Sequence, residues 1–304
     1  IGRIAGQFAK PRSSPTEQVG DLELPSFRGH MVNDIAPTAA ARVPDPDRLV
    51  QAYHQSAATL NLLRAFTKGG FAALSRVHSW NQEFIATSAQ GRRYDAIAAE
   101  IDRALRFMQA CGIELEGASQ LHEVDFYTSH EALLLGYEEA LTRQDSLTGD
   151  WYDCSAHLVW IGERTRGLSD AHVEFFRGIH NPVGVKVGPS TQPEVLLRLI
   201  DRLNPAGEPG KIALITRMGA DKAAAALPPL VEVVRRAGKR VLWMCDPMHG
   251  NGVKTAGGIK TRNFDAILKE LETSFDALKA GGAHLGGVHF ELTGEDVTEC
   301  VGGA

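Results

Sequence analysis

Basic side chains lie in or directly after apolar runs in the second half of the chain. Lys186 lies inside VGVKVGP, Arg164 follows WIGE and Arg217 follows KIALIT. If these runs are parallel strands, their carboxyl ends meet at one mouth and cations from separate strands converge there. Because such cations repel one another unless anions lie between them, the pattern favours a small polyanionic substrate. Each cation taken alone is more simply interpreted as a surface ion pair.

A histidine and a glutamate at two further run ends form half of a divalent-metal site. His249 follows the run RVLWM in CDPMHGN, and Glu291 lies in HFEL after the next run. Imidazole with carboxylate suits Mn, Fe, Co or Zn, although two ligands alone are a weak signal. We interpret Cys245 as a packed thiol, and His289 as a core residue or a support for the ligands.

Other side chains near the same run ends are open to two interpretations. Glu163 and Glu131 could orient the cations or a water molecule, or they could form structural ion pairs. Trp160 is either a core residue or a wall of the substrate pocket. The remaining candidates near the start of the chain are Arg3, Lys10, Arg12 and Ser13.

The elements that would position these residues alternate between strands and helices. We expect strands near 1–7, 123–129, 156–162, 183–187, 211–217, 240–246 and 286–292. We expect amphipathic helices over 193–204, 228–237 and 264–280, and a proline-containing loop over 11–25. The alternation predicts a parallel sheet in an α/β fold, and seven strands are one short of a (β/α)8 barrel. The pattern therefore predicts a TIM barrel without its first strand and its last helix.

The segment at about 47–111 breaks this alternation, because it has helical periodicity and is much longer than a crossover needs. We expect a single partial barrel domain over 1–304 with a helical insertion there, which could be an oligomer interface, a regulatory site or additional core. Both chain ends look trimmed, since the chain begins with Ile1 in a strand-like run.

The composition excludes several classes of protein. The net charge of −5 gives no reason to expect non-specific nucleic-acid binding. The sequence contains no apolar run of the length, about 18 residues, that a membrane helix needs, and no secretory signal. Its four cysteines form no CxxC pair, which favours a reducing, cytoplasmic location.

Taken together, these motifs resemble those of the class II 3-deoxy-D-arabino-heptulosonate 7-phosphate (DAHP) synthases. The resemblance rests on RIAGQFAKPRS, FYTSHEALLLGYEEAL, WIGERTR, NPVGVKVGP, TRMG, CDPMHGN and ELTGEDVTECVGGA, and covers essentially the whole chain. It implies a (β/α)8 barrel, cytoplasmic or plastidic in a plant. It also implies an aldol-type condensation of phosphoenolpyruvate with erythrose 4-phosphate, which releases phosphate. This reaction is the first step of the shikimate pathway.

The resemblance also implies residue roles. The positions that match phosphoenolpyruvate contacts are Arg3, Glu163, Arg164, Lys186 and Arg217, with Lys10 as a further contact near that substrate. Arg12 and Ser13 match positions that hold the erythrose phosphate. His249 and Glu291 match metal ligands, while the family's Cys and Asp ligands belong to motifs before Ile1 and after Ala304.

The resemblance suggests how the reaction would use these groups. Lys186 would act as the general acid at the new alkoxide, with a metal-bound water as the alternative. Glu163 would position the attacking water, and the metal held by His249 would polarise the aldehyde. The family further implies a homo-oligomer, feedback by aromatic amino acids and, in some members, a chorismate mutase partner.

Two other functions remain open. The chain could belong to a homologue in a secondary pathway such as phenazine formation, or to another phosphoenolpyruvate-dependent sugar-phosphate synthase, since only the acceptor side would differ. It could also be a non-catalytic regulatory homologue, although a scaffold has no need to hold like charges together.

Overall fold

The computed structural model describes residues 2, 6–71, 73–74, 76, 89–114, 121, 123, 125–256, 260–292 and 300–302. The chain forms two compact units, Ile1–Gly6 with Val50–Thr128 and Gln7–Leu49 with Ser129–Ala304. The first unit contains most of helix α1 (Asp47–Lys68) and helix α3 (Ala89–Ala110). The second unit contains the central sheet. The expected single domain with an inserted segment stays a prediction.

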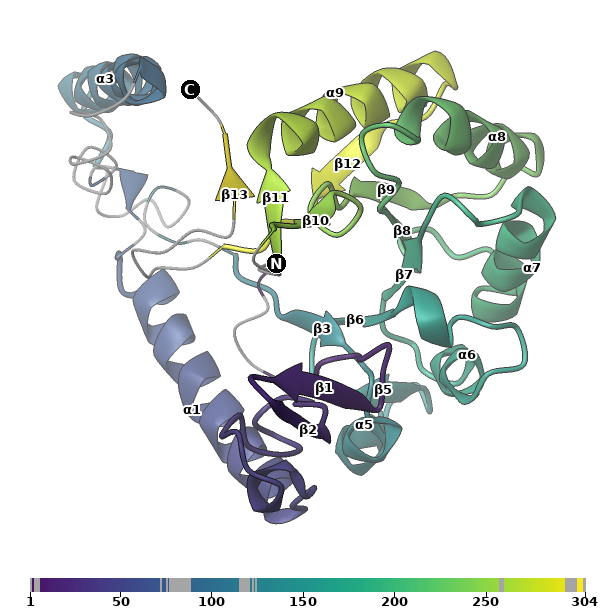
Figure 1. Cartoon of the computed structure of the whole chain (residues 1–304). Helices are drawn as coiled ribbons and strands as arrows, with labels where there is room; N and C mark the ends of the chain where they lie inside the picture. Colours follow the sequence, from purple (N-terminus) through teal and green to yellow (C-terminus); the bar gives the residue numbers. More distant parts are fainter. Residues whose placement is uncertain are drawn as a thin grey trace. The chain divides into compact units, whose positions relative to one another are not determined.

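The second unit is built on a six-stranded parallel sheet, which confirms the predicted α/β class (Figure 1). The spatial order is β12-β9-β8-β7-β6-β3. The strands of this sheet therefore lie side by side in the order in which they occur along the chain. The strands are β3 (Ser129–Glu131), β6 (Leu158–Ile161), β7 (Val183–Val187), β8 (Ile212–Thr216), β9 (Leu242–Cys245) and β12 (Leu285–Val288). Their carboxyl ends therefore share one edge, as the site hypothesis requires.

Helices follow the strands and lie on the outer face of the sheet (Figure 1). They are α5 (Leu135–Leu141), α6 (Ala171–Arg177), α7 (Pro193–Leu203), α8 (Ala223–Arg236) and α9 (Phe264–Ala280). The start predicted for α8 was wrong, because Pro228 and Pro229 lie inside the helix rather than in its first turn. Four alanines at 223–226 extend the helix towards its N-terminus, since alanine has the highest helix propensity.

Three further predictions about the first half differ from the structure. The expected loop over 11–25 contains an antiparallel hairpin of β1 (Thr16–Val19) and β2 (Leu22–Pro25), which turns at Gly20 with φ of 60°. The strand expected near 123–129 starts only at Ser129. Of the strand expected near 1–7, the structure describes a parallel bridge between Gly2 and Thr128, while residues 1 and 3–5 lie outside the described residues.

Among the described residues, the remaining short elements are two 3-10 turns, η1 (Ala40–Arg42) and η4 (Glu163–Thr165), and five short strands. The strands are β4 (Thr142–Gln144), β5 (Trp151–Asp153), β10 (Gly252–Lys254), β11 (Lys260–Asn263) and β13 (Cys300–Val301). In the part of the chain that the structure describes, no helix combines the length and the apolar character needed to cross a membrane.

Strands β6, β7 and β8 are buried on both faces, which explains why they are continuous apolar runs apart from Lys186 and Thr216. On the outer face, alternate strand residues such as Val185 and Leu214 pack against the helices. On the inner face, Trp160 and Ile215 belong to a smaller apolar cluster. A Cβ at Gly184 would lie 2.7 Å from the Trp160 Cβ, so that only glycine fits at position 184. This alternation places Lys186, two residues further on, on the same inner face.

A buried polar cluster fixes the start of the second unit against β3 and α5. Gln7 donates from Nε2 to Glu138 Oε1 at 2.5 Å and accepts from Leu134 N at 2.6 Å. Glu138 Oε1 also contacts His130 Nε2 at 2.8 Å. Burial, together with the neighbouring Glu138 carboxyl, raises the pKa of Asp153 to about 7. The cluster thus places two carboxyl groups side by side in the protein interior.

Asp153→Asn should stabilise the protein more at pH 8 than at pH 5. Between the ordinary aspartate pKa of about 4 and the folded-state pKa of about 7, only the folded state keeps the proton, so that this group's contribution to stability falls as pH rises. Asparagine keeps an acceptor for Ser155 N and adds a donor for Glu138. We expect a gain of about 1–3 kcal/mol at pH 8 and little change at pH 5, measured by urea unfolding.

The exposed variant Asp150→Asn is the control and should show no such pH-dependent gain. An equal effect of Asp153→Asn at both pH values would contradict the raised pKa of Asp153.

Candidate active site at the carboxyl ends of the strands

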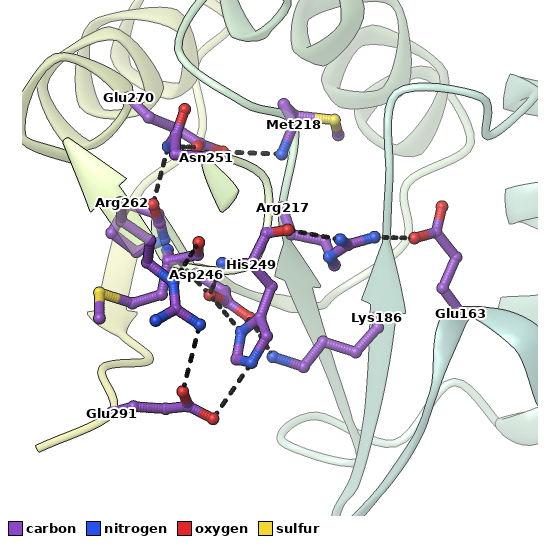
Figure 2. A network of polar contacts seen from close by, with 12 residues as sticks. Glu163, Lys186, Arg217, Met218, Asp246, His249, Asn251, Arg262, Glu270 and Glu291 are labelled. Carbon is purple, nitrogen blue, oxygen red and sulfur yellow. Dashed lines mark hydrogen bonds and ion pairs between the residues drawn. The ribbon is translucent and has the colours of Figure 1, made fainter. Parts of the chain in front are cut away.

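Lys186 extends from the inner face of β7 and is 7% exposed. Its Nζ forms an ion pair with the Asp246 carboxylate (Figure 2). The same Nζ lies 5.7 Å from the centre of the Trp160 ring. Burial lowers the pKa of Lys186, and the Asp246 charge opposes that shift. A buried lysine needs a neighbouring anion to keep its charge, and for Lys186 that anion is the Asp246 side chain.

Asp246 follows the last residue of β9 and is fully buried. Its carboxylate accepts from His249 Nδ1, at 2.8 Å for Oδ2 and 3.0 Å for Oδ1. Burial raises the pKa of Asp246, but the hydrogen bond from His249 and the charge of Lys186 outweigh it and bring the pKa far below its usual range. Asp246 was not among the predicted site residues. Its position three residues before His249 in an Asp-Pro turn was the available signal.

His249 and Glu291, the two expected metal ligands, lie together. His249 Nε2 is 3.1 Å from Glu291 Oε1, and Arg262 NH2 is 3.5 Å from Glu291 Oε2. Hydrogen bonds to Asp246 and Glu291 raise the pKa of His249 to about 9, and the bond from His249 lowers that of Glu291 to about 2. Arg262, from β11, was also absent from the sequence-based set.

These two side chains fit half of a metal site. A metal-bound histidine typically donates its other ring nitrogen to a carboxylate, and His249 has Asp246 in that position. Among the described residues, no group of three or more His, Cys, Asp or Glu side chains is arranged to hold an ion. Cys245 is buried against Ser274, and burial raises its pKa to about 12, as expected of a packed thiol.

The His289 ring contacts the rings of both Trp160 and His249. Its ring centre is 5.0 Å from that of Trp160 and 6.4 Å from that of His249, and its backbone N donates to Cys245 O at 2.7 Å. Burial lowers the pKa of His289 to about 4, so that it is neutral near pH 7. The ring therefore supports His249 by packing.

Arg217 joins the cationic side of the site to the His249 loop. Its NH1 forms an ion pair with Glu163 Oε2, and its NH2 donates to the backbone O of His249 at 2.6 Å (Figure 2). Glu163 Oε1 also lies 4.0 Å from Arg166 NH2. Glu163 therefore lies between two guanidinium groups from neighbouring parts of the strand-end edge.

The other sequence-based candidates lie at different places. Arg164 is exposed in η4, and Glu131, at the end of β3, adds to the negative potential that Lys186 experiences. Arg12 donates from Nε to Phe27 O at 2.5 Å. Lys10 and Ser13 are exposed on the segment before β1, and Arg3 lies outside the described residues. The substrate-binding roles of all these residues stay predictions.

A buried glutamate on α9 holds the two loops of the site together. Glu270 accepts from Met218 N at 2.7 Å and from Asn251 Nδ2 at 2.6 Å (Figure 2). The same loops meet where Gly250 lies against Gly219. A Cβ at Gly250 would be 2.5 Å from Gly219 N and 2.9 Å from its Cα. The loops that bear Arg217 and His249 are thus fixed by one carboxylate and one backbone contact.

Gly250→Ala should destabilise the protein, because the new methyl group meets backbone that cannot rotate away. We expect the free energy of unfolding to fall by about 1–3 kcal/mol in urea titrations. Gly252→Ala is the matched control, since a Cβ there meets no atom within 4 Å, and its effect should stay within about 0.5 kcal/mol. Equal effects of the two variants would contradict the close approach.

Comparison with known proteins assigns the family. A family model described as the Class-II DAHP synthetase family matches residues 1–304. A phospho-2-dehydro-3-deoxyheptonate aldolase of Streptomyces coelicolor is 56% identical over 303 residues, which cover 100% of this chain and 67% of that protein. The protein of Mycolicibacterium smegmatis named phospho-2-dehydro-3-deoxyheptonate aldolase AroG is 50% identical over 309 residues, which cover 100% of this chain and 65% of that protein. The chain thus spans about two thirds of the length of these relatives and belongs to the class II DAHP synthase family.

Proposed function

We propose that this chain carries the condensing site of a DAHP synthase, which joins phosphoenolpyruvate to erythrose 4-phosphate and releases phosphate. The observation that carries the proposal is the convergence of Lys186, Arg217 and His249 at one edge of the parallel sheet, in a chain that matches the family throughout. We further propose that the sheet closes into a (β/α)8 barrel. The sequential order of its parallel strands and the helices on its outer face support that closure.

The cations would bind and orient the enol phosphate. Lys186 and Arg217 project at the carboxyl ends of adjacent strands, β7 and β8, and Arg164 follows β6. Arg217 forms an ion pair with Glu163 here, so that a bound carboxylate or phosphate would compete with Glu163 for the guanidinium. Fixing the plane of the enol places its C3 for attack on the aldehyde carbon.

Proton transfer would then use groups already in place. As the C3–C bond forms, the aldehyde oxygen becomes an alkoxide, and the Lys186 Nζ can donate a proton to it. Formation of that bond uses the C2–C3 π electrons and leaves C2 electron-deficient, so that water adds there while Glu163 would accept a hydrogen bond from it. The C2–O bond to phosphate then breaks, and the protons lost by the added water go to the departing phosphate and to solvent. Asp246 keeps a negative charge beside Lys186 throughout.

His249 Nε2 and Glu291 would hold a divalent ion of the Mn, Co, Fe or Zn class, which would supply Lewis-acid polarisation of the aldehyde. The geometry that supports this is the carboxylate on His249 Nδ1, with Glu291 on the opposite side of the ring. A homo-oligomer, a chorismate mutase partner and a cytoplasmic location stay predictions.

Lys186→Met in the full-length protein should lower the rate of phosphate release by about 10²–10⁴-fold, because it removes both the charge and the acid. Phosphate release is assayed with phosphoenolpyruvate and a panel of aldose phosphates, so that the preferred acceptor is identified in the same experiment. Lys269→Met, at a lysine side chain that is 63% exposed on α9, is the control and should retain normal turnover. Near-normal turnover in folded Lys186→Met would remove Lys186 from the mechanism.

Removal of divalent ions by a chelator should abolish phosphate release, and added Mn²⁺ should restore it. His249→Ala should not respond to Mn²⁺ at concentrations that restore the unmodified protein, because the imidazole ligand is lost. His54→Ala, at an exposed position of α1, is the control and should recover fully. Full activity after exhaustive chelation would contradict the proposed ion.

A further inference from the structure

The carboxylate of Asp246 joins the two halves of the site. Its Oδ2 contacts both Lys186 Nζ and His249 Nδ1 (Figure 2). Its Oδ1 accepts from the backbone N of Met248 and of His249, each at 3.1 Å. One fully buried side chain therefore contacts the expected substrate-binding lysine and an expected metal ligand at the same time.

The surrounding backbone leaves Asp246 little freedom to choose other partners. Its backbone N donates to Thr216 O at 2.7 Å, which ties the end of β9 to the end of β8. The two amide donors that follow it close a turn around Oδ1. Oδ2 is thereby directed towards the inner face, where Lys186 and the His249 ring meet it. The geometry is set by the fold and not by a flexible side chain.

The two contacts at Oδ2 have separate consequences. The contact with Lys186 supplies a counter-charge on the buried inner face, where an ammonium group without an anion is costly. The contact with His249 holds Nδ1 as the donor, which turns Nε2 towards Glu291, so that an ion replacing the Nε2 proton would be bound on that side. Loss of Oδ2 would disturb both groups at once.

We propose that Asp246 is a positioning residue that couples the two sides of this site, by holding the Lys186 ammonium for an anionic substrate and the His249 ring for a divalent ion. The inference rests on the proposed function for the identity of substrate and ion. It adds that the two binding events depend on one shared carboxylate.

The test is Asp246→Asn in the full-length protein. Asparagine keeps an oxygen for the amides of Met248 and His249 and for the longer His249 Nδ1 contact of 3.0 Å. It removes the carboxylate charge and replaces Oδ2 by an NH2 group, which cannot accept from Lys186 or make the shorter 2.8 Å contact with His249 Nδ1. We expect Mn²⁺ affinity to fall about 10–100-fold, measured by competition with a chromophoric chelator. We also expect phosphoenolpyruvate affinity of the metal-free protein to fall about tenfold, measured by calorimetry.

Two further variants separate positioning from other effects. Glu291→Gln should weaken Mn²⁺ binding but leave phosphoenolpyruvate affinity of the metal-free protein within twofold, because Glu291 does not contact Lys186 in the described structure. Asp221→Asn, whose side chain is 93% exposed, should change neither affinity. We also expect Asp246→Asn to raise the KM for phosphoenolpyruvate even at saturating Mn²⁺. Weaker metal binding alone would not explain a raised KM when the metal site is saturated.

Each outcome decides for or against the inference. If folded Asp246→Asn binds both Mn²⁺ and phosphoenolpyruvate within twofold of the unmodified protein, the inference is overturned. It is also overturned if only one of the two affinities falls. If Asp246→Asn does not fold, Asp246→Ser is used, because its hydroxyl can still accept from the turn amides. Failure of both to fold would also overturn the inference, since Asp246 would then serve the fold alone. Absence of phosphoenolpyruvate and Mn²⁺ binding in the unmodified protein would instead contradict the proposed function.

Discussion

The ion pair between Lys186 and Asp246 is the interaction on which the site depends. A lysine inside an apolar strand is costly to bury, and this one has its counter-charge at the end of a strand two places along the sheet. The pair exists only if β7, β8 and β9 are parallel and in register, because otherwise the carboxyl ends of β7 and β9 would not share an edge. The fold and the chemistry therefore rely on the same alignment.

The loops around this pair are held by contacts from outside the sheet. Glu270 reaches from α9 to the loops after β8 and β9, and Gly250 lies against Gly219 where any side chain would collide. Catalytic groups on loops are usually positioned by a rigid scaffold, and here the scaffold extends to the helix layer. His249 is consequently held at its ring by Asp246 and at its carbonyl by Arg217.

The charges of the site compensate one another in the absence of substrate. Arg217 is paired with Glu163, Lys186 with Asp246, and His249 with both Asp246 and Glu291. A dianionic enol phosphate would add negative charge to this balance, and Glu163 is the carboxylate placed to yield to it, since its side chain is only half-buried. Asp246, by contrast, is fully buried and held by backbone amides.

The sequence by itself determined the α/β class, the parallel order of strands and the residue types at their carboxyl ends, because hydrophobic periodicity and motif spacing are local properties. It also identified His249 and Glu291 as neighbours, since adjacent parallel strands bring their ends together. It did not reveal the β1–β2 hairpin, in which prolines suggested a loop, or the start of α8, where alanine propensity outweighed the proline signal. Only the tertiary structure decided that Asp246 lies between Lys186 and His249 and that Glu270 holds their loops. The contacts of Lys186 with Asp246 and of Glu270 with Met218 join residues distant in sequence, and the contact of Asp246 with His249 depends on side-chain direction.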